Sequence, residues 1–139
     1  MGSIGETQAM KFIIDTSLVI DKLRGGSRWD TFLRVVEKDA ELFLPTVVIY
    51  ELYSGQSTKQ QTIRNKIQDL VKFFQRVDLT GTVAKRSGEL YRDAKEHFSL
   101  ADYVIAATAM ELGAEVVTLN KKHFEKISGV RIFDFENEI

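Results

Sequence analysis

The stretch Lys11-Phe12-Ile13-Ile14-Asp15-Thr16-Ser17 decides the fold, because an apolar run without polar alternation ends at a carboxylate. A strand of a parallel sheet is covered on both faces and therefore has a continuous apolar sequence. The helical pattern Leu18-Val19-Ile20-Asp21-Lys22-Leu23 begins directly after the turn. This order of strand, turn and helix predicts an α/β fold. It places Asp15 at the carboxyl end of a strand, where open α/β sheets bind ligands.

Strand-like and helix-like segments alternate along the rest of the chain. Further strands are predicted at residues 41–44, 76–79, 115–119 and 130–134. Helices are predicted at residues 27–38, 46–55, 63–74, 81–98 and 99–113, followed by a short one at 120–124. Strands that alternate with helices favour a parallel sheet between helical layers.

The composition fits one globular domain. The chain has 139 residues, 44% of them hydrophobic, and a net charge of -1. This balance argues against a generally basic nucleic-acid coat protein, but a nucleic-acid enzyme needs only a local basic rim. We expect a single domain over residues 10–139, and an expression tag or a disordered N-terminus over residues 1–9.

Two scarce residue types restrict the chemistry. The chain has no cysteine, which excludes thiolate zinc sites and agrees with a reducing cytoplasm. His97 and His123 are the only histidines, and surface or capping roles are expected for them. A bound metal would therefore be held by carboxylate oxygens, which favours Mg²⁺ or Mn²⁺ over Zn²⁺. No apolar run is long enough to span a membrane, and the first ten residues lack a signal-peptide pattern.

Three carboxylates interrupt apolar runs. Asp15 ends a strand, Glu51 lies in the apolar helix of residues 46–55, and Asp102 lies near the start of the helix at 99–113. Thr118 and Asn120 lie at the end of the strand at 115–119, on the same edge of a parallel sheet. Mutual repulsion would raise the pKa values of clustered carboxylates unless a cation neutralises them. The pattern therefore predicts one shared site for a hard divalent ion.

Each of these positions also has an ordinary structural explanation. Asp15 could cap a helix, Asp102 could interact with a helix dipole, and Asn120 could occupy a turn. Glu51 could face solvent. One shared site explains all four residues together and is the interpretation preferred here. Basic side chains after the first strand are candidates for phosphate contacts or for a solvated helix face. They are Lys22, Arg24 and Arg28.

Four segments together resemble the PIN domain, and most closely the VapC-type toxin ribonucleases of prokaryotes. They are Phe12-Ile13-Ile14-Asp15-Thr16-Ser17, Thr46-Val47-Val48-Ile49-Tyr50-Glu51-Leu52, Leu100-Ala101-Asp102-Tyr103-Val104-Ile105-Ala106-Ala107-Thr108-Ala109, and Val117-Thr118-Leu119-Asn120-Lys121-Lys122-His123-Phe124. The resemblance covers residues 10–135. It implies a three-layer α/β/α sandwich with a mostly parallel sheet of four or five strands.

The resemblance also implies a function. It implies an endoribonuclease that depends on Mg²⁺ or Mn²⁺ and cleaves RNA with metal-activated water, as the toxin of a type II toxin–antitoxin pair. Asp15, Glu51 and Asp102 would hold the metal, and Thr16 or Ser17 would orient Asp15 or a bound water. The family's fourth acidic position falls at Asn120, whose neutral amide makes a second metal less favourable. A VapB-like antitoxin and a homodimer are the implied protein partners.

Some other enzyme classes require residues that this sequence lacks, and two further functions remain as alternatives. A phosphotransferase of the haloacid-dehalogenase type needs a second Asp where this chain has Ser17, and Lys121 fits a receiver domain poorly. Neither GxGxxG nor GxxxxGK occurs, so nucleotide-binding folds lack support. A PIN-like scaffold that only binds RNA or protein, with Asn120 weakening the site, remains an alternative. A housekeeping RNA-processing nuclease is another.

Overall fold

The computed structural model describes residues 9–138 and contains a parallel sheet of four strands in the order β3-β2-β1-β4. The strands are β1 (Lys11–Ile14), β2 (Glu41–Pro45), β3 (Gln75–Val77) and β4 (Glu115–Val117). The expected strands at 11–15, 41–44, 76–79 and 115–119 are thus present. The prediction of a tag or disordered segment falls on residues 1–9, of which residues 1–8 lie outside the described residues.

The central strand explains why its sequence lacks alternation. In β1, Phe12, Ile13 and Ile14 are all buried. β1 pairs in parallel with β2 on one side and with β4 on the other. Because the strand lies between two neighbours and helices cover both faces, every side chain after Lys11 meets apolar groups.

The predicted strand at 130–134 is reduced to one bridge. Ile132 pairs in parallel with Val116, and the Val116 amide donates to the Arg131 carbonyl at 2.8 Å. The Phe133 amide donates in turn to the Val116 carbonyl at 2.9 Å. The pairing stops there because the chain turns into η2 (Phe135–Glu138), which packs against α2.

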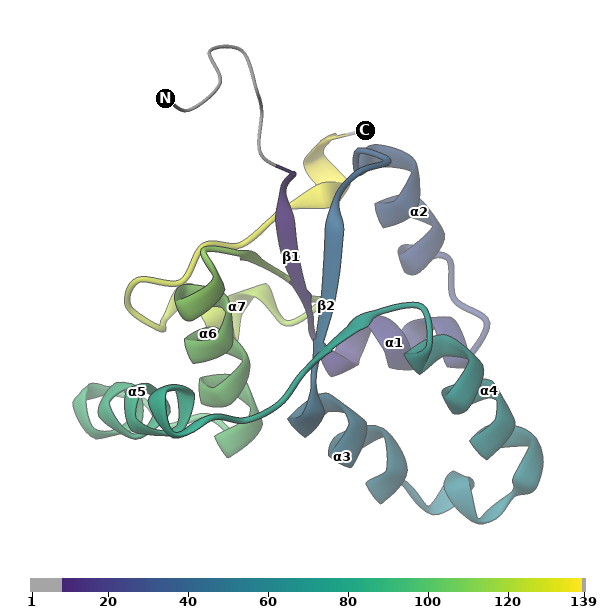
Figure 1. Cartoon of the computed structure of the whole chain (residues 1–139), viewed down its shortest axis with the longest axis horizontal. Helices are drawn as coiled ribbons and strands as arrows, with labels where there is room; N and C mark the ends of the chain where they lie inside the picture. Colours follow the sequence, from purple (N-terminus) through teal and green to yellow (C-terminus); the bar gives the residue numbers. More distant parts are fainter. Residues whose placement is uncertain (1–8, 139) are drawn as a thin grey trace.

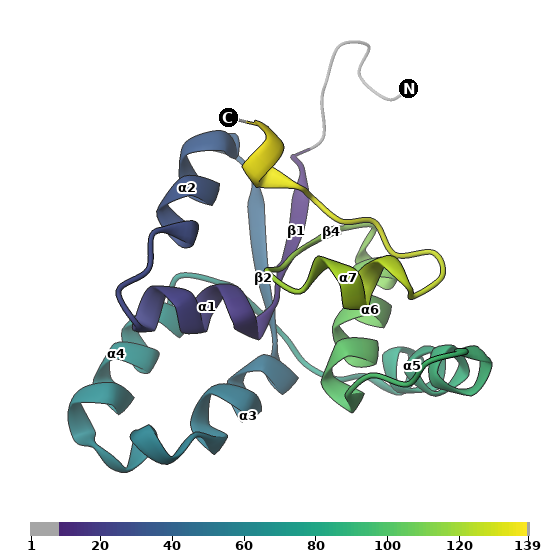
Figure 2. The same ribbon diagram turned by 180° about the vertical axis from the view of Figure 1, so that it is seen from behind.

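Helices cover both faces of the sheet, as Figures 1 and 2 show from opposite sides. One layer holds α1 (Thr16–Leu23), α2 (Arg28–Val35) and α4 (Gln61–Val71), and the other holds α5 (Gly81–Asp93), α6 (Leu100–Leu112) and α7 (Lys121–Glu125). Beyond the carboxyl end of β2, α3 (Thr46–Ser54) and η1 (Gln56–Lys59) lead towards α4, and α3 contacts α1, α4 and α6. Within residues 9–138, no helix has the length and apolar character needed to cross a membrane.

Helix α6 is the most buried helix neighbouring the sheet, and residues 101–109 are all buried. Ala106 and Ala109 belong to the main core, so their small side chains let the helix approach β1 and β4 closely. Val104 and Ala107 form a second cluster with Val83 of α5. Gly113 ends the helix in the left-handed conformation, with φ of 65°, which favours glycine.

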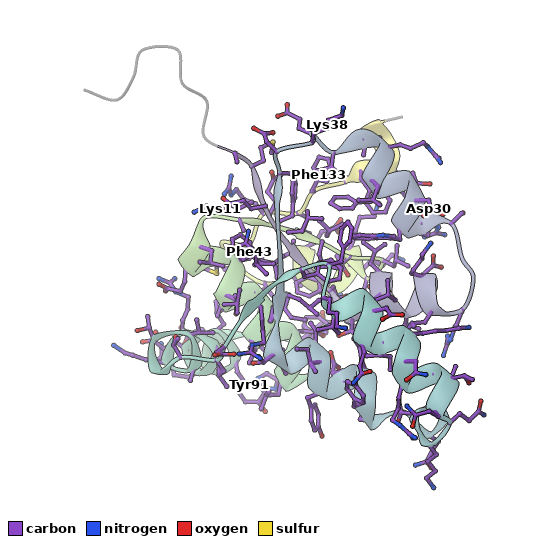
Figure 3. All side chains as sticks on the ribbon, turned by 45° about the vertical axis from the view of Figure 1, so that its right-hand side comes forward. Lys11, Asp30, Lys38, Phe43, Tyr91 and Phe133 are labelled. Atoms are coloured by element: carbon purple, nitrogen blue, oxygen red, sulfur yellow. The ribbon has the colours of Figure 1, made fainter. Side chains whose placement is uncertain are left out.

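Aromatic side chains fill the space between the sheet and α2. The ring centroid of Phe133, which Figure 3 labels, lies 4.9 Å from that of Phe12 and 6.0 Å from that of Phe32. Trp29 packs 5.4 Å from Phe32 and 5.4 Å from Phe74, which connects α2 to the segment after α4. The C-terminal segment therefore belongs to the core.

The predicted helix at 81–98 ends earlier than expected. α5 stops at Asp93, and Ala94 adopts an extended conformation. The buried Tyr103 hydroxyl accepts from the Phe98 amide at 3.2 Å and donates to the Glu96 carbonyl at 3.1 Å. These bonds hold residues 94–99 as a loop over the start of α6.

Enlarging Ala106 should destabilise the fold. We expect Ala106→Leu to lower the free energy of unfolding by about 1–3 kcal/mol, because a fully buried site against the sheet has no room for three more carbons. Urea denaturation measures the loss. Ala84→Leu, on the exposed surface of α5, is the matched control. Equal stability of the two variants would contradict close packing of α6.

Candidate functional site

Asp15 lies at the centre of the carboxyl edge of the sheet. Its amide donates to the Val117 carbonyl at 3.0 Å, which continues the pairing of β1 with β4. The residue is only 3% exposed. Its Oδ2 atom accepts hydrogen bonds from Ser17 Oγ at 2.7 Å and from Thr118 Oγ1 at 2.7 Å.

The two hydroxyls are themselves held by the backbone. Ser17 Oγ accepts from the Leu119 amide at 3.0 Å, and Thr118 Oγ1 accepts from the Asn120 amide at 2.9 Å. Each hydroxyl thus accepts one hydrogen bond from a backbone amide and donates one hydrogen bond to Asp15. This arrangement fixes the Asp15 carboxylate and connects β1, α1 and the exit of β4.

Glu51 approaches the same edge from α3. The hydroxyl of Thr16, the first residue of α1, donates to Glu51 Oε1 at 2.5 Å. The Glu51 side chain is partly buried, in a helix whose other residues are mostly apolar. Thr16 therefore contacts Glu51, while Ser17 contacts Asp15.

Asp102 lies in the first turn of α6. Ser99 caps this helix, because its Oγ atom accepts from the Asp102 amide at 3.2 Å. The position lets the positive end of the helix dipole stabilise the carboxylate. Asp102 Oδ2 lies 3.3 Å from His123 Nδ1 of α7.

The carboxylates influence one another electrostatically. Burial raises the pKa of Asp15, hydrogen bonds from Thr118 and Ser17 lower it, and the charge of Asp102 raises it. Burial also raises the pKa of Glu51, and the charges of both Asp15 and Asp102 raise it further. The three predicted acids therefore meet in one electrostatic field, although they come from β1, α3 and α6.

The donor atoms suit a hard cation. Mg²⁺ typically binds through one or two carboxylates and retains several waters. Within residues 9–138, however, no group of three or more His, Cys, Asp or Glu side chains is placed so that it could hold a metal ion. The three acids share one electrostatic field, and a cation bound there would need water for its remaining ligands.

The other predicted site residues are more peripheral. Asn120 is exposed at the start of α7, and its side chain makes no capping hydrogen bond. Lys22 pairs with Asp30 at 3.3 Å, and Arg28 pairs with Glu136 at 3.6 Å. Lys22 lies in the last turn of α1, and Arg24 and Arg28 follow this helix, so all three belong to the end of α1 opposite Asp15.

His123 is a site residue that sequence reasoning assigned to the surface or to a cap. Besides its contact with Asp102, its ring stacks on Phe98 with centroids 4.6 Å apart and planes 25° apart. One signal was available in the sequence. His123 follows Asn120 by three residues in a predicted helix, and this spacing puts both on one helix face.

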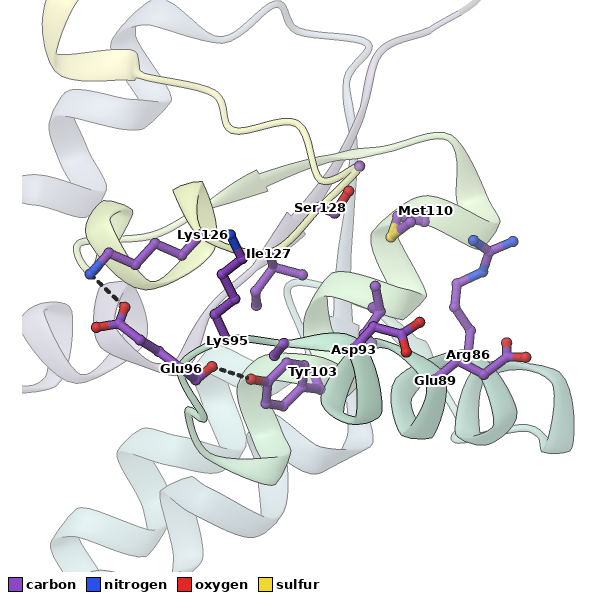
Figure 4. A pocket seen from close by; sticks show the side chains of 13 residues that line it. Arg86, Glu89, Asp93, Lys95, Glu96, Tyr103, Met110, Lys126, Ile127 and Ser128 are labelled. Atoms are coloured by element: carbon purple, nitrogen blue, oxygen red, sulfur yellow. Dashed lines mark hydrogen bonds and ion pairs between the residues drawn. The ribbon is translucent and has the colours of Figure 1, made fainter.

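A pocket of about 910 Å³ lies away from the carboxylates (Figure 4). Its walls come from α5, from α6 and from the segment after α7. Arg86, Glu89, Asp93, Lys95, Glu96 and Lys126 give it a mixed charge. Its lining includes Ala94, Lys95 and Glu96 of the loop at 94–99 and Tyr103 of α6, but none of the three acids.

Comparisons with known proteins give a consistent result. The sequence model of the PIN domain matches residues 12–130. Ribonuclease VapC10 of Mycobacterium tuberculosis is 31% identical over 115 residues, which cover 81% of this chain and 84% of the relative. A chain of VapBC2 from Rickettsia felis, solved with a promoter DNA fragment, has a TM-score of 0.79 at 19% identity and covers 89% of this chain and 98% of its own. A chain of a toxin–antitoxin complex from Klebsiella pneumoniae has a TM-score of 0.70 at 25% identity. The match covers 88% of this chain and 95% of the other.

The acidic site should make the cation-free protein sensitive to pH. The pKa values of Asp15 and Glu51 lie above their ordinary values of 3.8 and 4.5, so the folded chain binds more protons than the unfolded chain between the ordinary and the raised values. We therefore expect the free energy of unfolding in EDTA to fall as the pH rises through this interval and to level off above it. Urea titrations at a series of pH values measure the slope.

Glu51→Gln should reduce that slope, and Glu89→Gln, at an exposed position of α5, should leave it unchanged. Identical slopes for the wild type and Glu51→Gln would show that Glu51 does not share the buried field.

Proposed function

Because the chain belongs to the PIN domain family, we propose that it is a metal-dependent endoribonuclease and the toxin of a type II toxin–antitoxin pair. The relationship to ribonuclease VapC10 supports the reaction, since the alignment covers most of both chains. The structural observation that carries the proposal is the shared field of three carboxylates, in which the charges of Asp15 and Asp102 raise the pKa of Glu51. Such a field favours a cation at the site.

Asp15, Glu51 and Asp102 would hold Mg²⁺ or Mn²⁺. When bound, the ion supplies charge stabilisation at the scissile phosphate and activates water for attack. Asn120, exposed beside this group, contributes a neutral amide at most, which favours one ion over two. The reaction needs no covalent nucleophile from the chain.

The neighbouring hydroxyls orient the acids. Ser17 and Thr118 occupy Asp15 Oδ2, and Thr16 occupies Glu51 Oε1. The other carboxylate oxygens, Asp15 Oδ1 and Glu51 Oε2, would be the ones offered to the cation. His123 holds Asp102 Oδ2 in the same way. The chain thus fixes its acids before substrate arrives, and this lowers the reorganisation needed during cleavage.

The proposal includes partners. RNA is the substrate, and the activity is expected in the cytoplasm. The expected protein partners are a VapB-like antitoxin and a second toxin chain. The toxin–antitoxin complex from Klebsiella pneumoniae, which has the same fold, supports an antitoxin. Leu33 of α2 and Phe73 after α4 are exposed and line a pocket of about 310 Å³, which offers an apolar surface to a protein.

Neutralising Asp102 or Asp15 should abolish cleavage. We expect the wild type to cut RNA in Mg²⁺ or Mn²⁺ and to stop in EDTA, and we expect Asp102→Asn and Asp15→Asn to lower the rate at least about 100-fold, because a neutral amide binds the ion weakly. Gel analysis of labelled cellular RNA measures the rate.

Asp78→Asn is the matched control, because Asp78 is exposed and pairs only with Arg76 in the described part of the chain. Cleavage that persists in EDTA and in both site variants would exclude a metal-dependent reaction at these acids. A wild type that binds RNA without cutting it under any divalent ion would favour the binding scaffold.

Loss of a supporting hydroxyl should have a smaller effect. We expect Thr118→Ala to reduce the cleavage rate about 10- to 100-fold, the usual effect of removing a group that orients a metal ligand. Thr118→Ser keeps the hydroxyl and should retain most of the rate. Equal rates for Thr118→Ala and the wild type would show that the bond to Asp15 Oδ2 has no role in the reaction.

A further inference from the structure

An aromatic pair lies directly beside the acidic site. The His123 ring stacks on the ring of Phe98, with the centroids 4.6 Å apart. Its Nδ1 edge meets Asp102 Oδ2 at 3.3 Å. The His123 side chain is nevertheless 46% exposed, so one ring face is packed, one edge is fixed, and the remaining ring surface is open to solvent.

The support of this ring is rigid. Phe98 belongs to the loop at residues 94–99, and the buried Tyr103 hydroxyl bonds to both Phe98 and Glu96 of that loop. Lys126, after α7, forms an ion pair with Glu96 at 2.7 Å. Figure 4 shows Glu96 between Lys126 and the Tyr103 hydroxyl. The loop that carries Phe98 is therefore bonded to α6 through Tyr103 and to the segment after α7 through the Lys126–Glu96 ion pair.

We propose that the exposed face of His123, backed by Phe98, is a stacking platform for one base of single-stranded RNA. The inference rests on the proposed ribonuclease function and identifies a substrate subsite for it. Aromatic rings that present a free face bind nucleobases by stacking and accept any base, because every base has a π-face. A base held there brings its adjoining phosphodiester towards Asp102.

The chemistry around the ring favours a base over a phosphate as its occupant. Asp102 contacts the His123 ring, and Asp102 shares one electrostatic field with Asp15 and Glu51. An isolated phosphate beside the ring would therefore be repelled by these acids. A neutral base has no such penalty. The platform therefore holds the uncharged part of a nucleotide, while a cation at the carboxylates offsets the charge of the phosphate.

Variants of His123 separate stacking from hydrogen bonding to Asp102. His123→Phe keeps the aromatic face and loses the ring nitrogens, whereas His123→Asn keeps a hydrogen-bond donor and loses the ring. We expect His123→Ala and His123→Asn to weaken RNA binding about 5- to 150-fold, which corresponds to roughly 1–3 kcal/mol for one stacked base. We expect His123→Phe to bind within about twofold of the wild type.

The probe is a fluorescein-labelled oligoadenylate of about ten nucleotides, and fluorescence anisotropy in a Ca²⁺ buffer gives its Kd. A gel confirms that the RNA stays intact, and thermal melting confirms that each variant is folded. His97→Ala is the matched control, because His97 also stacks on an aromatic ring, that of Tyr91 at 4.1 Å, and its side chain hydrogen-bonds to the Tyr91 carbonyl. Its Kd should be unchanged.

Three results would overturn the platform. They are equal Kd values for the wild type and His123→Ala, recovery of binding by Asn but not by Phe, and absence of oligoadenylate binding by the wild type. The second result would instead make His123 a positioning residue for Asp102. Cleavage by the wild type and its loss in Asp15→Asn are measured separately, so the platform can fail while the ribonuclease function stands.

Discussion

The double hydrogen bond to Asp15 Oδ2 connects the parts of the structure that make the site. Ser17 and Thr118, which donate these bonds, come from α1 and from the exit of β4, and both are themselves held by backbone amides of residues 119 and 120. The aspartate is buried, and an unpaired carboxylate there would be costly. The two bonds offset part of that cost. They also hold the end of β4 next to β1, and so they fix where α7 begins.

Much of the fold was predictable from hydrophobic patterns, because the central strands are apolar on both faces and the helices have clear periodicity. The edges were harder to predict. Residues 130–134 have the composition of a strand, yet aromatic packing of Phe133 against Phe12 and Phe32 turns this segment towards α2 after one bridge. Residues 94–98 continue the pattern of α5, but the tertiary bonds of Tyr103 hold them as a loop. Long-range contacts of this kind leave no periodic signal in a sequence.

The candidate site was likewise only partly predictable from the sequence. Asp15, Glu51 and Asp102 were identifiable because each places a charge in an apolar run, and burial then requires a partner for it. The turn geometry after β1 determines which hydroxyl bonds to which acid: Thr16 donates to Glu51, and Ser17 donates to Asp15. His123 is exposed, as expected, but its contact with Asp102 follows from the packing of α7 on α6, and its spacing from Asn120 is too weak a signal to predict that contact.

The acidity of the site determines how an anionic substrate can approach it. The chain as a whole is nearly neutral, with a net charge of -1, so no general positive field attracts RNA. The basic residues Lys22, Arg24 and Arg28 lie at or after the far end of α1, and Lys22 and Arg28 already pair with acids. In the proposed mechanism, binding would therefore combine a cation at the carboxylates with contacts to the uncharged bases. The proposed cation alone would hold any phosphate, whereas the proposed base contact would require a flexible single strand whose bases are unstacked. The two proposals together would favour RNA loops and unpaired segments as substrates.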